Sequence, residues 1–179
     1  QLRREVVLVP QDAFLFGQPL RENLSYDDPT REEPIVLAAA ERAELLAMLD
    51  RLPEGLRTLV GERGITLSGG QRQRATVARG VIREAPVLLL DDCFAAVDTE
   101  TEERILSHLI ELRARMTTVM VTHRVSTARH ADAILVLEDG RVAEYGTHDS
   151  LLAANGWYAA LAGEQDLSRA EARSAGAEA

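Results

Sequence analysis

The run Leu-Ser-Gly-Gly-Gln-Arg-Gln-Arg at residues 67–74 and the run Val-Leu-Leu-Leu-Asp-Asp at residues 87–92 say most about the fold of this chain. In the first run, Ser68 stands where a helix would be capped. The two glycines after it leave backbone N–H groups exposed at the positive end of the helix dipole, and such a position suits phosphate. The second run is a short apolar strand, of the kind buried in a parallel sheet, that ends in two carboxylates. Together the two runs indicate half of a nucleotide site.

The other half of such a site is a glycine-rich loop with a phosphate-binding lysine, and the chain contains no lysine. The chain also begins with Gln1 and no methionine, and the apolar run Val6–Val9 follows at once as an expected buried strand. We therefore expect this sequence to be part of a longer protein, with the missing loop upstream of Gln1. Residues 1–179 by themselves are not expected to bind nucleotide firmly or to be active.

Composition and charge narrow the class of protein. With 179 residues and 46% hydrophobic side chains, the chain can bury one sizeable core. It has no apolar run near the roughly 18 to 20 residues that cross a bilayer. A net charge of −9 argues against nucleic acid as a partner, since a phosphate-backbone binder presents clustered arginine and lysine. The single cysteine, Cys93, excludes an internal disulfide and favours a reducing compartment.

Strands and helices are expected to alternate along the chain. The apolar runs predict strands at Val6–Val9, Val87–Leu90 and Thr117–Val121. The dipeptide Asp139-Gly140 between two further apolar runs predicts a hairpin. Alternation of this kind predicts an α/β fold with a mostly parallel sheet.

Two helices carry expected capping boxes. Thr30 with Glu33 precedes a helix expected over residues 35–52. Thr99 with Glu102 precedes another helix in the same way. These patterns predict where each helix begins.

In a parallel sheet, ligands gather outside the carboxyl ends of the strands, so the polar residues that follow each strand are candidates for a site. They are Gln11, the pair Asp91 and Asp92, and His123. Each has an ordinary alternative: the glutamine as a loop residue, the aspartates as caps of the next helix, and the histidine as a hydrogen-bonded structural group. The Ser-Gly-Gly run could be only a cap and a tight turn, but its glycine pair also suits phosphate. In this order and spacing, however, the four signals reinforce one another.

This combination resembles the ATP-binding-cassette (ABC) transporter ATPases, and the resemblance extends from Val6 to Leu161. The matching motifs are Gln11 for the Q-loop glutamine, 67–71 for the signature motif, 87–92 for the Walker B strand, 95–98 for the D-loop and His123 for the switch histidine. The resemblance implies a P-loop NTPase-like fold. We expect residues 1–162 to be the C-terminal part of an ABC ATPase domain, with a helical (signature) subdomain over about 18–84. A polar, disordered tail is expected over 163–179.

Several short runs make the resemblance that of an exporter. They include Phe14-Leu15-Phe16-Gly17 after the Q-loop, Val60-Gly61-Glu62-Arg63-Gly64 before the signature motif, and Gly156-Trp157-Tyr158 near the end. An exporter-type domain implies a second ABC ATPase domain as partner, and a transmembrane domain whose coupling helices would contact residues 13–23. It also implies a place at the cytoplasmic face of the cell (inner) membrane, attached through that transmembrane domain.

The resemblance further implies ATP and Mg²⁺ as ligands. Asp91 would hold Mg²⁺, usually through water, and Gln11 would add an oxygen near the same ion and sense the γ-phosphate. His123 would contact the γ-phosphate and help orient the attacking water. The Ser-Gly-Gly run would close on a γ-phosphate held by the opposite subunit, because the family sandwiches ATP between two domains. The nucleotide-contacting residues carried over from the signature motif and the D-loop are Leu67, Ser68, Gly69, Gly70, Gln71 and Asp98.

One position departs from the pattern of the family. The catalytic base is usually a glutamate directly after the Walker B aspartate, and in this chain that residue is Asp92. Aspartate is shorter by one methylene, which withdraws the carboxylate by roughly 1 Å, and misplacement of that order costs about 10²-fold in rate. The chain therefore resembles the weak-site subunit of a heterodimeric exporter. Two alternatives stay open: a non-hydrolysing regulatory ATP-binding subunit, and a soluble ABC ATPase that works without a transporter.

Overall fold

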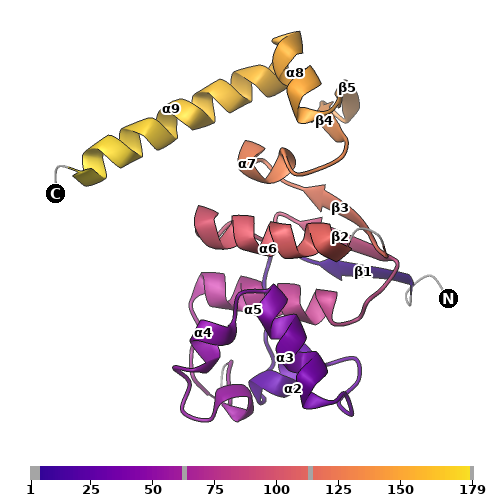
Figure 1. Ribbon diagram of the computed structural model, residues 1–179, viewed down its shortest axis with the longest axis vertical. Helices are drawn as coiled ribbons and strands as arrows, with labels where there is room; N and C mark the ends of the chain where they lie inside the picture. Colours follow the sequence, from indigo (N-terminus) through magenta and orange to yellow (C-terminus); the bar gives the residue numbers. More distant parts are fainter. Residues whose placement is uncertain (1–4, 62–63, 113–114, 178–179) are drawn as a thin grey trace. The chain divides into compact units, whose positions relative to one another are not determined.

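The computed structural model describes residues 5–61, 64–112 and 115–177. Contacts within the chain divide it into two compact units, of which the first ends at Val121 and the second begins at Thr122 (Figure 1). The boundary between them lies inside the domain expected over 1–162, whose extent stays a prediction.

A parallel sheet forms the centre of the first unit. Its strands are β1 (Val6–Val9), β2 (Val87–Asp91) and β3 (Thr117–Val121), with β2 in the middle (Figure 1). Both neighbouring pairs are parallel, and Val6 of β1 stands opposite Val87 of β2. The three apolar runs thus form the strands predicted for them, and the α/β fold with a parallel sheet is confirmed.

Helices fill the chain between these strands. Between β1 and β2 lie α2 (Leu20–Leu24), α3 (Glu33–Arg42), α4 (Leu46–Leu49), the 3-10 helix η1 (Gly55–Arg57) and α5 (Gly69–Val81). The chain from β2 to β3 contains α6 (Thr99–Leu112). Helix α5 contacts α2, α3 and β1, so it joins the other helices to the sheet (Figure 1). The run from α2 to α5 coincides with the helical subdomain expected over about 18–84, whose status as a subdomain stays a prediction.

One face of the sheet is buried under α5. At Gly80, an added Cβ would stand 2.5 Å from Cγ2 of Val9, so only a glycine lets the helix lie this close to the strand. The opposite face is exposed: Leu8, Val119 and Val121 are 57%, 49% and 61% exposed. The core of the first unit therefore lies on the α5 side of the sheet.

The helix expected over 35–52 is interrupted. A left-handed residue, Glu44 with a φ of 56°, follows the end of α3. The amide of Glu44 donates to the carbonyl of Glu41 (2.8 Å), and the amide of Leu45 donates to the carbonyl of Ala40 (2.9 Å). These paired bonds are those of a Schellman cap, and Leu45 is fully buried behind it. The prediction of one continuous helix is therefore wrong.

The capping box expected at Thr30 does not form. Helix α3 begins at Glu33, its N-cap is Glu32, and no side chain caps it. Pro34 stands in the first turn, where its missing N–H would have no partner within the helix in any case. Thr30 instead donates its amide (3.0 Å) and its hydroxyl (2.6 Å) to Oδ1 of Asp28, which makes a local turn.

The second unit is built from a hairpin and helices. Its elements are α7 (Val125–Ala128), β4 (Ile134–Glu138), β5 (Arg141–Gly146), α8 (His148–Ala154) and α9 (Trp157–Ala177). Strands β4 and β5 pair antiparallel around Asp139 and Gly140, whose φ angles of 48° and 74° are the positive values that a tight hairpin turn needs. The predicted hairpin is confirmed. Ile134, Leu151 and Tyr158 form a small core of their own.

Helix α9 runs through the segment that was expected to form a disordered tail. It continues to Ala177, well beyond residue 163. Alanine, glutamate and arginine are frequent in this stretch, and they favour helix even where few apolar side chains anchor it. Scarcity of large apolar residues therefore does not exclude a helix. Among the described residues, no helix has both the length and the apolar character needed to cross a bilayer.

Candidate functional site

The run at residues 67–71 forms the start of α5. Oγ of Ser68 accepts from the amide of Gln71 (3.3 Å), and Oε1 of Gln71 accepts from the amide of Ser68 (2.8 Å). This capping box confirms the helix start predicted at Ser68. Leu67 is buried, and its carbonyl accepts from Nη1 of Arg72 (2.7 Å). The first turn of α5 is thus held in place by its own residues.

The two glycines of this run let another segment approach the helix start. An added Cβ on Gly70 would lie 2.5 Å from the carbonyl oxygen of Ala96, and one on Gly69 would lie 3.2 Å from Cβ of Ala96. Oε1 of Gln73 accepts a hydrogen bond from the amide of Ala96 (2.7 Å). Residues 95–98 therefore lie directly against the first turn of α5. The structure brings together the two segments that resemble the D-loop and the signature motif.

Gln73 is not among the predicted site residues. It is buried, and it lies one helical turn from the buried residue Val77. A polar side chain at a buried helical position must find its hydrogen bonds inside the protein, and this is the signal that could have indicated it. Its partner lies 23 residues away in the sequence, so no local pattern indicates the contact.

Asp98 caps the next helix. Its Oδ1 accepts from the amide of Thr101 (2.9 Å), the pattern of an N-cap for α6. This hydrogen bond from the backbone is the main cause that lowers the pKa of Asp98. The capping box expected from Thr99 and Glu102 is therefore wrong by one residue, because α6 already begins at Thr99. Asp98 is exposed, so the carboxylate that caps α6 is also accessible from solvent.

The residues at the carboxyl ends of β1 and β2 meet. Nε2 of Gln11 donates to Oδ2 of Asp92 at 3.3 Å. Asp91 is the last residue of β2 and is half-buried. The amide of Asp92 donates to the carbonyl of Val121 (2.9 Å), and its φ of 41° is a left-handed conformation that aspartate tolerates better than most residues. These contacts gather Gln11, Asp91 and Asp92 at one edge of the sheet.

This edge suits a cation that a bound nucleotide helps to hold. Among the described residues, no group of three or more histidine, cysteine, aspartate or glutamate side chains could hold a metal ion by itself. Mg²⁺ is usually bound through one or two carboxylates together with phosphate oxygens and water. Asp91 supplies such a carboxylate, and Gln11 follows the neighbouring strand. The oxygens present therefore fit Mg²⁺ bound together with nucleotide phosphates.

Cys93 follows the two aspartates and is buried. Burial raises the pKa of its thiol to about 12, so the thiol is protonated at neutral pH. Reactivity and metal binding both need the thiolate. The one thiol of the sequence is therefore a packed core group.

His123 lies in the second unit and is exposed. Its carbonyl oxygen accepts from Nε2 of Gln165 (2.7 Å), and Oε1 of the same glutamine accepts from the amide of Val125 (2.9 Å). One side-chain amide of α9 thus holds the backbone on both sides of Arg124. Gln165 falls in the segment expected to be a disordered tail, so sequence reasoning misses this support of His123.

An aromatic cluster lies in and beside the segment expected to contact a transmembrane domain. The rings of Phe14 and Phe16 meet edge to face with centroids 5.0 Å apart, and Phe16 stacks on Tyr26 at 4.6 Å. Phe14 and Tyr26 are 58% and 54% exposed. Exposed aromatic residues gathered in one place are typical of contact surfaces.

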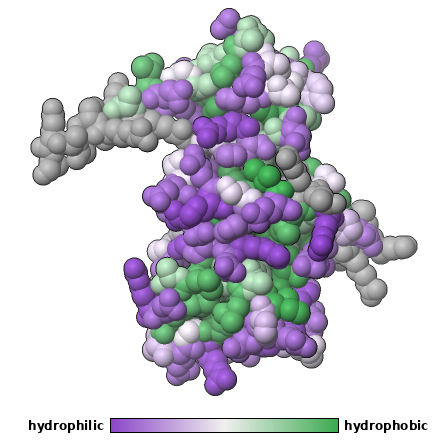
Figure 2. All heavy atoms as spheres, in the orientation of Figure 1, coloured by the Kyte–Doolittle hydropathy of each residue, from purple (hydrophilic) through white to green (hydrophobic). Residues whose placement is uncertain are grey.

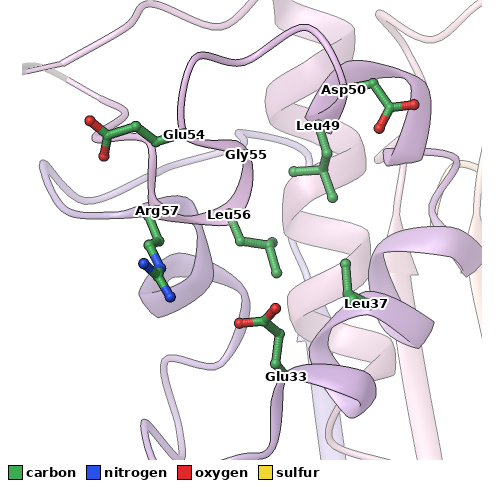
Figure 3. A pocket seen from close by; sticks show the side chains of 8 residues that line it. All are labelled: Glu33, Leu37, Leu49, Asp50, Glu54, Gly55, Leu56 and Arg57. Atoms are coloured by element: carbon green, nitrogen blue, oxygen red, sulfur yellow. The ribbon is translucent and has the colours of Figure 1, made fainter.

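A separate hollow lies among α3, α4 and η1, where apolar surface gathers on the face seen in Figure 2. Its volume is about 560 Å³, and Leu37, Leu49 and Leu56 point into it in Figure 3. Glu33 and Glu54 are among the charged residues that line it. None of the predicted site residues lines this hollow. The hollow and the predicted nucleotide residues are therefore different places on the first unit.

Comparison with known proteins identifies the family. Residues 1–95, more than half of the chain, match the family described as ABC transporter, and the chain belongs to this family. The ATP-dependent lipid A-core flippase of Shewanella sp. (strain MR-4) is 47% identical over 163 residues, which are 89% of this chain and 27% of that protein. The probable multidrug resistance ABC transporter ATP-binding/permease protein YheI of Bacillus subtilis (strain 168) is 44% identical over 177 residues, 99% of this chain and 30% of that protein.

A solved structure agrees with these relatives. It is described as a bacterial Atm1-family ABC exporter with ATP bound, and it superposes with a TM-score of 0.86 at 41% identity. The match covers 92% of this chain and 29% of that chain. This chain thus spans less than a third of the length of the proteins it matches. The expected class, an ATPase domain of the ABC exporter type present in part, is confirmed at the level of the family.

Proposed function

We propose that this chain is the C-terminal part of an ATPase domain of an ABC exporter, and that the full-length protein couples ATP binding and hydrolysis to export across a membrane. The observation that supports this most is the packing of residues 95–98 against the first turn of α5, with the amide of Ala96 bonded to Gln73 at 2.7 Å. This packing holds two nucleotide-contacting segments in one arrangement. The exporter-type relatives support the coupling to transport.

In this proposal, the start of α5 recognises a phosphate group. Gly69 and Gly70 lie in the first turn, where N–H groups have no carbonyl partner within the helix and stand at the positive end of its dipole. Together with the hydroxyl of Ser68, they would close on the γ-phosphate of ATP held by a second ABC ATPase domain. Asp98, in the adjacent segment, would contact the same nucleotide. Such contacts suit phosphoryl transfer, which depends mainly on positioning and charge stabilisation.

The edge of the sheet would serve the nucleotide of this chain's own site. ATP with Mg²⁺ supplies the phosphoryl group and the positive charge that neutralises its oxygens. Asp91 would hold the ion with Gln11 near it, and His123 would orient the attacking water. Asp92 would be a weak base, because its carboxylate is one methylene shorter than that of glutamate and already accepts from Gln11 at 3.3 Å.

The chain would then be the weak-site subunit of a heterodimeric exporter. Its signature run at residues 67–71 is intact and would serve the strong site of the partner domain. The coupling helices of a transmembrane domain would contact residues 13–23, where Phe14 and Phe16 form an aromatic cluster with Tyr26. Phe14 and Tyr26 of this cluster are exposed. This arrangement implies the cytoplasmic face of the cell (inner) membrane as its location.

Steady-state ATP turnover of the full-length, assembled protein tests the role of Asp92. Asp92→Glu restores the length of a glutamate base, so turnover is expected to rise or to stay unchanged. Asp92→Ala is expected to keep turnover within about twofold, because the partner's site carries most of it. Asp166→Ala, at an exposed aspartate of α9, is the matched control. Complete loss of turnover in Asp92→Ala, with the control unaffected, would contradict the asymmetric assignment.

Asp92 also supports a second candidate function, that of a non-hydrolysing regulatory ATP-binding subunit, because its short side chain makes it a poor catalytic base. Removing the catalytic base of the partner domain separates the two functions. If this chain's site hydrolyses ATP slowly, a small turnover remains in that variant, and Asp92→Ala then removes it. If the chain is purely regulatory, removing the partner's base abolishes turnover at once.

A further inference from the structure

The side chain of Asn23 holds the loop that follows β1. Asn23 lies on α2 and is fully buried. Its Oδ1 accepts from the amide of Phe16 (2.8 Å), while its Nδ2 donates to the carbonyls of Phe16 (3.0 Å) and Gln18 (3.2 Å). A buried amide that is satisfied at both ends favours a single backbone conformation. Residues 14–18 are therefore locked to α2.

Arg79 of α5 joins this loop from a distant part of the sequence. Its Nε donates to the carbonyl of Asn23 (2.7 Å), its Nη2 to Oδ1 of Asn23 (3.0 Å), and its Nη1 to the carbonyl of Phe14 (3.0 Å). Its guanidinium carbon lies 5.7 Å from the centre of the Phe16 ring, a cation–π distance. Burial of the guanidinium lowers the pKa of Arg79. Arg79 thus joins α5 to the loop through two contacts and to Asn23 of α2 through two more.

The half-buried position of the charged Arg79 guanidinium needs a physical explanation. Desolvating a cation costs free energy, and an apolar side chain of similar volume often stabilises a fold equally well. The guanidinium, however, is planar and carries its donors in a fixed fork, which neither an apolar side chain nor a flexible ammonium group provides. What Arg79 adds is therefore a fixed orientation of the loop at residues 14–18 relative to α5.

We propose that Asn23 and Arg79 form a clamp that transmits movement between the start of α5 and residues 14–18, with Arg79 as a positioning residue for residues 14–18. This inference rests on the proposed function, since it requires a transmembrane domain at the loop and a nucleotide at Ser68. Helix α5 is continuous from Gly69 to Val81. A packed helix of this kind carries a displacement over its length, which is roughly 16 Å between Arg79 and Ser68.

Hydrogen–deuterium exchange of the full-length protein tests the Asn23–Arg79 clamp, measured with and without Mg²⁺ and a non-hydrolysable ATP analogue. In the unaltered protein, the analogue is expected to slow exchange both at residues 67–74 and at residues 14–18. Arg79→Lys keeps the charge but loses the fork. The amides of 14–18 are then expected to exchange roughly tenfold faster and to stop responding to the analogue, while 67–74 still responds.

The matched control is Arg42→Lys, which alters a partly exposed arginine whose Nη1 lies 3.9 Å from Oε1 of Glu84, and it is expected to change neither segment. A response of residues 14–18 that persists in Arg79→Lys would overturn the clamp. Absence of any response at 67–74 in the unaltered protein would overturn the proposed function, and with it the basis of the clamp.

A second variant keeps the test decisive if Arg79→Lys does not fold. Asn23→Asp retains an acceptor for Arg79 but loses the Nδ2 donor that holds Phe16 and Gln18. Exchange at residues 14–18 is expected to rise and to lose its response to the analogue, while the start of α5 keeps its own. Unchanged exchange and an unchanged response at 14–18 would equally overturn the clamp.

Discussion

At Gly70, the backbone of the neighbouring segment comes so close that an added Cβ would lie 2.5 Å from the carbonyl oxygen of Ala96. Real Cβ atoms do not approach a backbone oxygen to that distance, so any larger residue must displace Ala96. Gln73 holds the amide of the same residue at 2.7 Å and resists that displacement. Gly70 and Gln73 of α5 therefore set the position of residues 95–98: Gly70 leaves room for the backbone of Ala96, and Gln73 holds its amide.

Gly70→Ala is accordingly expected to push Ala96 away and to lower the stability of the fold by about 1–3 kcal/mol, the usual cost of overpacking. Gly163→Ala is the matched control, because an added Cβ there meets no atom within 4 Å and improves the helix propensity of α9. Thermal unfolding of the full-length protein measures both variants. Equal shifts of the midpoint would show that the close approach at Gly70 is not a constraint.

Asp98 makes the stability of α6 depend on pH. The hydrogen bond from the amide of Thr101 lowers its pKa from the ordinary 3.8, so folding favours the ionised form. Its contribution is fully present above pH 3.8 and is lost as the pH falls through the lower, folded-state pKa. Asp98→Asn keeps a good capping acceptor that does not titrate. The difference in unfolding midpoint between Asp98→Asn and the unaltered protein should therefore change as the pH falls below 3.8, and a constant difference would contradict this.

Among the elements, the strands could be predicted and the end of α3 could not. Each strand is a continuous apolar run, and such runs in alternation with helices form a parallel sheet. The Schellman cap after α3 normally contains glycine at its left-handed residue, and in this chain that residue is Glu44. The sequence therefore contains no local signal for the break. Thr99 looks like a cap as well. Only the hydrogen bond that the amide of Thr101 donates to Oδ1 of Asp98 shows which of the two neighbours caps the helix.

Two adjacent leucines test the break between α3 and α4. Leu45 is fully buried at the Schellman cap, while Leu46 is 39% exposed. Leu45→Ala is expected to cost about 2–5 kcal/mol of unfolding free energy, the usual range for a buried leucine, and Leu46→Ala less than about 1 kcal/mol. Denaturant unfolding of the two variants measures the difference. A larger loss at Leu46 would mean that the chain does not turn at Glu44.

In the candidate site too, some contacts could be predicted from the sequence and others could not. Gln11, Asp91 and Asp92 could be placed together from the sequence, because parallel strands end at the same edge of a sheet. The contact of Gln73 with Ala96 joins residues 23 apart, and that of Arg79 with Asn23 joins residues 56 apart. Contacts of this range depend on how α5 packs against the rest of the unit. Only the three-dimensional structure reveals them.

At the scale of the whole molecule, the residues proposed for catalysis are divided between the two units. Ser68 and the cluster of Gln11, Asp91 and Asp92 lie in the first unit, and His123 lies in the second. The chain spans less than a third of the length of the relatives it matches, so turnover is a property to measure on the full-length assembly. Two unequal nucleotide sites would exist only in that assembly. They are tested by a variant that acts across the interface between two domains.

We propose that the start of α5 serves a nucleotide bound by a second domain. Steady-state ATP turnover of the full-length, assembled protein with Ser68→Arg tests it most directly, because the arginine would occupy the place of the phosphate and leave Asp91 and Asp92 intact. Ser68→Arg is expected to lower turnover by at least about 10²-fold, while Ser107→Arg, at an exposed serine of α6, leaves turnover unchanged. Turnover of Ser68→Arg within about twofold of the unaltered protein would contradict the claim.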